Sequence, residues 1–184
     1  MIRDAADVDE VVTITEYDPQ WPELFAVERA SVTKALVNVV TRVEHFGSTA
    51  IPGMAGKPIV DVLVGVRELS IVSNIVDAAL SRLGYDNFGE IFIPGRLYLR
   101  KRGPPHFNIA ITQDGGDFWN AQIIVRNYLR HHPDEAARYS AIKRSGYASG
   151  AHLFSTYSQS KAPFLEALMD RAETWYQRNG KQSS

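Results

Sequence analysis

The stretch that decides the fold runs from His45 to Val66 and reads HFGSTAIPGMAGKPIVDVLVGV. Its start continues an alternating segment, residues 41–46, which is typical of a β-strand. Its end, residues 59–66, is almost unbroken in apolar residues, as in a strand that is covered on both faces. Residues 51–57 between them are rich in proline and glycine and fit neither regular element. The stretch therefore predicts two strands joined by a loop, with the second strand central in a sheet.

The flanking sequence adds helices on both sides of this stretch. Helical spacing of apolar residues predicts helices at 21–36, 69–83, 118–130, 133–146 and 160–178. Short extended segments are expected at 11–15, 90–102 and 105–112, and the last two would form an antiparallel hairpin. We therefore predict the α/β (α+β) class, with a mixed sheet flanked by helices and a helical C-terminal part. Residues 1–10 are interpreted as a flexible tail before a single domain at 11–180.

Composition excludes several kinds of protein. The 184 residues carry a formal net charge of -1, which argues against an extended nucleic-acid surface. Cysteine is absent, so disulfides, a thiol nucleophile and cysteine-based metal sites are excluded. No run approaches the roughly 20 apolar residues that span a bilayer, and the acidic N-terminus lacks an apolar signal segment. A cytoplasmic protein without membrane contact is expected.

The loop and the strand after it contain the polar residues that suggest a binding site. Gly47 allows close approach of a ligand to the backbone, and Ser48 and Thr49 add hydroxyl donors, so a phosphate cradle is predicted with Lys57 as a neutralising charge. The alternative is a plain turn between two strands. Asp61 interrupts an apolar run, and a buried carboxylate needs either a partner or a function. The structural alternative for Asp61 is to cap loop amides or to pair with Lys57 or an arginine.

These residues resemble those of the nucleotidyltransferase superfamily, which has a Gly-Ser pair after a strand and an acid on the next strand. More closely, residues from about 12 to 176 are similar to the GrpB (glutamate-rich protein B) family. The motifs that carry this resemblance are Tyr17-Asp18-Pro19-x-Trp21, Glu44-His45-Phe46-Gly47-Ser48-Thr49-Ala50, Lys57-Pro58-Ile59-Val60-Asp61, Tyr128-Leu129-Arg130-x-His132-Pro133, Tyr139 with Lys143, and Tyr157 with Lys161. The resemblance implies a nucleotidyltransferase-like fold with a mixed sheet and a helical C-terminal part.

The sequence departs from the superfamily pattern at the second acid. An Asp-x-Asp pair would have its second aspartate at position 63, where this sequence has Leu63. Asp61 is therefore the single carboxylate of this strand that could bind a metal such as Mg²⁺. On the later extended segment, His106 and Asn108 project to one face. We expect Asp61 and His106 to face each other across a cleft as catalytic residues, with Asn108 beside them at the ligand.

Other candidates are basic and aromatic. Arg100, which shares a strand face with Arg102, is predicted either to clamp phosphate or to protect an exposed strand edge. The pairs Tyr139 with Lys143 and Tyr157 with Lys161 are each four residues apart, so each pair shares a helix face and can frame a phosphorylated ligand. Ordinary packing with the lysine ends reaching solvent is the alternative for both pairs.

Two functions of different classes follow from these residues. The first is a nucleotidyltransferase-type transferase that moves a nucleotidyl or related group with an incomplete carboxylate set. Acyl transfer with His106 as the acid-base group is a variant of it. The alternative is a noncatalytic domain for a nucleotide or CoA-type ligand, with a degenerate metal site. Either function predicts a small phosphorylated or nucleotide partner. A purely structural protein, with no ligand in the cleft, is the third possibility.

Overall fold

The computed structural model describes residues 2–179, except for the side chains of residue 5 and residues 71–74. Within this range a five-stranded sheet has the order β1-β2-β5-β4-β3. Its strands are β1 (Val40–Phe46), β2 (Ile59–Val66), β3 (Asp86–Asn87), β4 (Arg96–Lys101) and β5 (His106–Gln113). Only the β2–β5 pairing is parallel among these strands; β1–β2, β4–β5 and β3–β4 are antiparallel. The predicted mixed sheet, with β2 inside it, is confirmed.

The helices agree with the predicted positions to within a few residues, with one exception. They are α1 (Trp21–Ala35), α2 (Leu69–Ser81), α3 (Asp117–His131), α4 (Pro133–Ala148) and α5 (Phe154–Asn179), with short 3₁₀ turns η1 (Ala5–Val8) and η2 (Ser48–Ala50). The exception is α5, which begins six residues before the predicted start at 160. The predicted strand at 11–15 is wrong, because Val11 and Thr15 form isolated bridges to Leu153 and Gly56 instead of joining the sheet.

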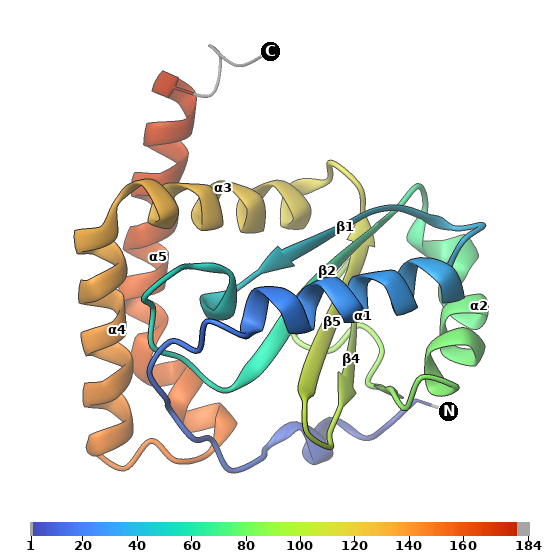
Figure 1. Ribbon diagram of the computed structural model, residues 1–184, viewed down its shortest axis with the longest axis horizontal. Coiled ribbons are helices and arrows are strands. Elements are labelled where there is room, and N and C mark those ends of the chain that lie inside the picture. Colours follow the sequence, from blue (N-terminus) through green and yellow to red (C-terminus); the bar gives the residue numbers. More distant parts are fainter. Residues whose placement is uncertain (1, 180–184) are drawn as a thin grey trace.

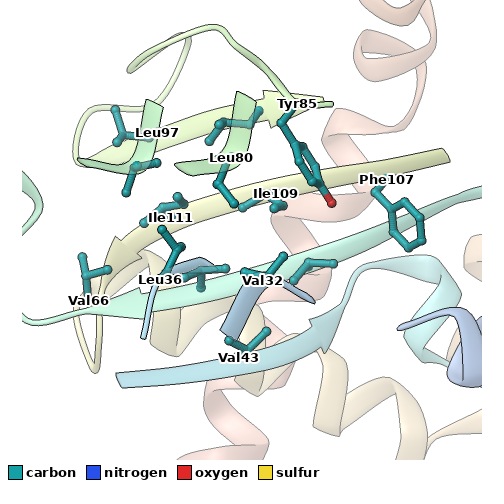
Figure 2. Packing of buried hydrophobic residues seen from close by; sticks show 14 of the residues in the cluster. Val32, Leu36, Val43, Val66, Leu80, Tyr85, Leu97, Phe107, Ile109 and Ile111 are labelled. Atoms are coloured by element: carbon teal, nitrogen blue, oxygen red, sulfur yellow. The ribbon is translucent and has the colours of Figure 1, made fainter. Parts of the chain in front are cut away.

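One face of the sheet carries the main core. Even-numbered residues of β2 and odd-numbered residues of β5 point to this face, where α1 and α2 cover them (Figures 1 and 2). The buried members include Val62, Val64, Ile109 and Ile111. By the alternation of a strand, Asp61 and Leu63 project to the opposite face. Leu63 is buried there with Ala110 and Trp119, so β2 is covered on both faces as its sequence predicts.

The C-terminal helices form a second core beside the sheet. Helices α3, α4 and α5 lie together at one side of the molecule (Figure 1). Gly146 allows α4 to approach α5 closely, because a Cβ at this position would lie 2.5 Å from Ser160 Oγ. Ile51 and Met54 of the β1–β2 loop are buried in this core. The loop therefore joins the sheet to the helices and places residues 47–57 at their junction.

The N-terminal segment differs from the expectation that ordered structure begins near Val11. Val8 is buried with Phe88 and Tyr98, and Glu10 accepts two hydrogen bonds from the Arg102 guanidinium, at 2.8 Å each. Neither the burial of Val8 nor the pairing of Glu10 with Arg102 produces a periodic pattern of apolar residues, so neither can be predicted from such a pattern. The flexibility of residues 1–10 and the domain limits 11–180 stay predictions, and residue 180 lies outside the described residues.

A membrane-spanning helix is not found among the described residues, since none of their helices is both long and apolar enough.

Candidate functional site

A cavity of about 780 Å³ lies between the sheet face that carries Asp61 and the C-terminal helices. It is lined from the end of β1, from β2, β4 and β5, and from α3 and α5. The predicted site residues that line it are Gly47, Ser48, Lys57, Asp61, Asn108, Tyr139 and Lys161. The predicted residues outside its lining are Thr49, Arg100, His106 and Lys143. The structure thus brings most of the loop and β2 candidates together with Asn108, Tyr139 and Lys161 from distant parts of the chain.

Gly47 and Asp61 are in direct contact at the floor of the cavity. The β1–β2 register pairs Phe46 with Asp61, so Gly47 is the first residue beyond the paired strand. Gly47 has a φ of 68°, and a Cβ on it would lie only 2.4 Å from Asp61 Oδ2. Glycine is therefore required twice, once for the backbone conformation and once for space. This contact explains why the residue before Ser48 is a glycine when β2 has an acid at position 61.

Asp61 is held by an amide rather than by a cation. Asn108 Nδ2 donates to its Oδ1 at 2.7 Å, and Asn108 Oδ1 accepts from Arg102 at 2.9 Å. Burial raises the pKa of Asp61, and the nearby positive charge of Lys57 opposes this shift. The partner that the sequence analysis sought for this acid is thus Asn108, directly opposite on β5.

Ser48 is positioned from behind by a buried lysine. Lys143 Nζ donates to Ser48 Oγ at 2.9 Å and also to the carbonyl oxygen of Ala55, and it lies 4.6 Å from the centre of the Tyr139 ring. Lys143 is only 1% exposed. Burial, followed by the positive charge of Lys161, lowers its pKa to about 7. Because Ser48 Oγ accepts from Lys143, the hydroxyl proton remains available to donate into the cavity.

The cavity has an excess of basic side chains. Its basic lining residues are Lys57, Arg96, Arg126 and Lys161, and its acidic ones are Asp9 and Asp61. Lys57 and Lys161 form no salt bridge with any described residue and instead lie 4.7 Å and 5.0 Å from the ring centres of Phe154 and Tyr157. Burial lowers the pKa of Lys57 to about 8, against the attraction of Asp61. An anion is the ligand that such a cavity favours.

The predicted backbone cradle is largely closed. The amides of Ala50, Ile51, Met54 and Gly56 donate to backbone carbonyl groups, and that of Ala55 donates to Ser140 Oγ. These amides are used because the loop is itself folded into tight turns and tied to residue 15 and to α4. Among the side chains that line the cavity, the Ser48 hydroxyl and the lysine ammonium groups can donate to an anion.

Thr49 and Arg100 do not line the cavity. Thr49 is 1% exposed, and its Oγ1 lies 2.9 Å from Nε2 of His45. Burial and the positive charges of two arginines lower the pKa of His45 to about 4. Arg100 is 2% exposed and donates to Val8 O and Tyr98 Oη. These two predicted phosphate ligands therefore hold the η2 turn and the N-terminal segment, respectively.

His106 is separated from Asp61 by the register of the sheet. Asp61 pairs with Asn108, whereas His106 pairs with Ile59 at the beginning of β5. The Nδ1 of His106 accepts from Gly103 N at 3.2 Å. Its catalytic role stays a prediction that this geometry does not favour, because the ring is used to close the β4–β5 turn.

The donor set does not fit a two-metal centre. Two-metal phosphoryl transfer needs several carboxylates around the ions. Within residues 2–179 no cluster of three histidine, aspartate or glutamate side chains has a suitable arrangement. Leu63 is buried against Trp119, and the residue across from Asp61 is Asn108. We therefore derive no chemical step through a metal ion at this site.

Sequence reasoning missed the aromatic wall of the cavity. Phe92, Tyr98, Phe118 and Phe154 line it together with Tyr157. Phe92 and Tyr98 come from the β3–β4 loop and the strand that follows it, whereas Phe118 belongs to α3 and Phe154 to α5. Each fits an ordinary core pattern in its own segment. Of the aromatic residues that line the cavity, Tyr139 and Tyr157 were indicated, through their spacing to Lys143 and Lys161.

The buried Lys143 ammonium predicts a particular dependence of stability on pH. Between the folded pKa of about 7 and the ordinary lysine pKa of 10.5, the unfolded state binds more protons, so the free energy of unfolding should rise with pH across this window. Lys143→Met should flatten that rise. The stability of this variant relative to the wild type should be greatest at pH 6, where the wild-type lysine is charged. Denaturant unfolding from pH 6 to 10 measures it, with Lys34→Met as an exposed control. Parallel profiles for wild type and Lys143→Met would contradict a charge buried at this position.

Comparisons with known proteins point to one family. The family model described as GrpB protein matches residues 11–171. The UPF0157 protein YqkA of Bacillus subtilis is 31% identical over 165 residues, which are 89% of this chain and 48% of that protein. The chain thus spans about half the length of YqkA. The crystal structure of the conserved protein GrpB from Enterococcus faecalis has a TM-score of 0.82 at 32% identity, with 89% of this chain and 99% of that chain covered.

A more remote likeness is to terminal uridylyl transferase 4 from Trypanosoma brucei with bound CTP. The TM-score is 0.47 at 17% identity, over 84% of this chain and 50% of that chain. No conclusion about a ligand is drawn from a likeness this remote.

Proposed function

The chain belongs to the GrpB family, and for this member we propose that the cavity binds a phosphate-bearing ligand of nucleotide size. The observation that supports it is the basic end of the cavity, where Lys57 and Lys161 lack an ionic partner among the described residues. Phosphate oxygens would accept from these ammonium groups and from the Ser48 hydroxyl. The volume of about 780 Å³ falls within the range of ordinary ligand pockets, roughly 300 to 1,000 Å³.

The remaining walls suit the rest of such a ligand. Away from the lysines the lining is mainly apolar and aromatic, as is typical of ligand pockets in which a few polar groups fix orientation. A phosphate ester with an apolar or aromatic body, such as a nucleotide or a CoA-type compound, matches this division. Inorganic anions alone would leave most of the cavity without a partner.

Group transfer is the second candidate, and Asp61 is the residue that favours it. Its carboxylate lies at the cavity floor with a raised pKa, which is a property of acid-base groups. A nucleotidyl transfer that depends on Mg²⁺ has less support, because the described residues include no cluster of three acidic or histidine side chains that could hold the ion. Ligand binding is therefore the function that the geometry favours most.

Asp61→Asn separates the two candidates. A carboxylate near a bound anion repels it, so the variant should bind ATP in EDTA as tightly as the wild type or more tightly. The amide keeps the shape beside Gly47, so the fold should be retained. Isothermal titration of ATP at pH 7, first with EDTA and then with Mg²⁺, measures the affinity of each protein without and with the metal ion. Wild-type binding that requires Mg²⁺ and is lost in Asp61→Asn would refute the metal-free site and favour the transferase.

A further inference from the structure

The loop between β3 and β4 presents an aromatic ring at the cavity. Phe92 lines the cavity although 68% of the residue is exposed. Its φ of 62° makes it the one non-glycine residue with a positive φ in the described chain. This conformation is unfavourable for a bulky residue, and residues held in it cluster at ligand sites. The loop thus holds an exposed phenylalanine at the cavity in a backbone conformation that costs free energy, although phenylalanine is normally buried.

Phe92 is connected to the basic end of the cavity through Phe154. The two ring centres are 6.5 Å apart with an interplanar angle of 25°. The Lys57 ammonium lies 4.7 Å from the centre of the same Phe154 ring. One ligand can therefore contact Lys57 with its phosphate and Phe92 with its other end, because a single ring separates the two side chains.

Arg96 adds a positively charged guanidinium group to this part of the lining. Its Nε is buried without a hydrogen-bond partner among the described residues, while Nη2 donates to Ile91 O at 2.6 Å. The guanidinium is held over the rings of Tyr98 and Phe118, at 4.9 Å and 5.7 Å. The Nε atom itself has almost no accessible surface, so a ligand in the cavity would contact Arg96 through the other atoms of its side chain.

We propose that Phe92, Phe154 and Arg96 form a subsite for a nucleobase. The flat ring of the base stacks on Phe92, and an acceptor on its edge accepts a hydrogen bond from the Arg96 guanidinium. Because every base has a π face, the stacking itself is tolerant of base identity, whereas the arginine favours bases with an acceptor at that edge. This inference rests on the proposed function, which supplies the phosphate end at Ser48 and Lys57.

The test compares ATP with tripolyphosphate, which carries similar charge and no base. Phe92→Ala should weaken ATP binding about tenfold, the size expected from the loss of one stacked base, and should leave tripolyphosphate binding unchanged. Phe92→Tyr keeps a ring and should bind ATP like the wild type. Tyr176→Ala removes an exposed aromatic ring outside the cavity and serves as the control. Isothermal titration at pH 7 measures all four proteins.

The outcomes separate this inference from the proposed function. ATP affinity that is unchanged in Phe92→Ala, or that falls together with tripolyphosphate affinity, overturns the nucleobase subsite. Wild-type binding of ATP without tripolyphosphate, lost in Phe92→Ala, supports the subsite while refuting the anion site. If the wild type binds neither compound, both proposals fail.

Discussion

Gly47→Ala is expected to lower the free energy of unfolding by about 3 kcal/mol. An L-residue at positive φ costs roughly 1 to 2 kcal/mol, and the forced displacement of a packed side chain costs about as much again. Here the new Cβ would lie 2.4 Å from Asp61 Oδ2, so the carboxylate must leave its place beside Asn108. For a chain of this length the melting temperature should fall by roughly 6 to 12 °C.

Gly53→Ala is the matched control for this substitution. Gly53 lies in the same loop with a φ of 76°, and a Cβ there would meet nothing within 4 Å. Its variant should therefore lose only the backbone contribution, about 1 kcal/mol. A second comparison uses Asp61→Ala, in which the colliding oxygen is absent. If Gly47→Ala costs as much in that background as in the wild type, or no more than Gly53→Ala, the contact with Asp61 is not the cause.

The sheet and most helices could be predicted because their signals are local. Strand β2 has the predicted bounds, Ile59–Val66, since burial on both faces leaves a continuous apolar run. The strand predicted at 11–15 failed because a short β-branched run does not show whether a partner strand exists. β3 was missed for the related reason that two residues, Asp86–Asn87, are too few to show any alternation.

The sequence predicted mainly the part of the candidate site that lies on the β1–β2 loop and on β2. The spacing from Gly47 to Asp61 is short, and the β1–β2 pairing brings these residues together. The direction of each side chain is not encoded in the same way: Thr49 turns to His45, whereas Ser48 beside it faces the cavity. The register between β2 and β5 likewise decided that Asn108, and not His106, would face Asp61.

Removal of both cavity lysines, Lys57 and Lys161, should have the largest effect on the affinity for the ligand. Charge-assisted hydrogen bonds are worth roughly 1.5 to 3 kcal/mol each, so Lys57→Ala with Lys161→Ala should weaken tripolyphosphate binding at least about 100-fold. The fold should be retained, because neither ammonium forms a salt bridge with a described residue. The control removes two exposed charges elsewhere, with Lys34→Ala and Arg82→Ala. It keeps the net charge of the test variant, so long-range attraction of the anion is matched.

The central claim is that side-chain cations in the cavity bind a phosphate-bearing ligand without a metal ion. Isothermal titration of tripolyphosphate in EDTA at pH 7 measures it most directly, on the wild type, the double lysine variant and the matched control. At this pH the Lys57 ammonium is largely protonated, because its pKa is about 8. We expect saturable one-site binding to the wild type and the control, and its loss in the variant without Lys57 and Lys161. Absence of wild-type binding in EDTA, or equal affinity in all three proteins, would contradict the claim.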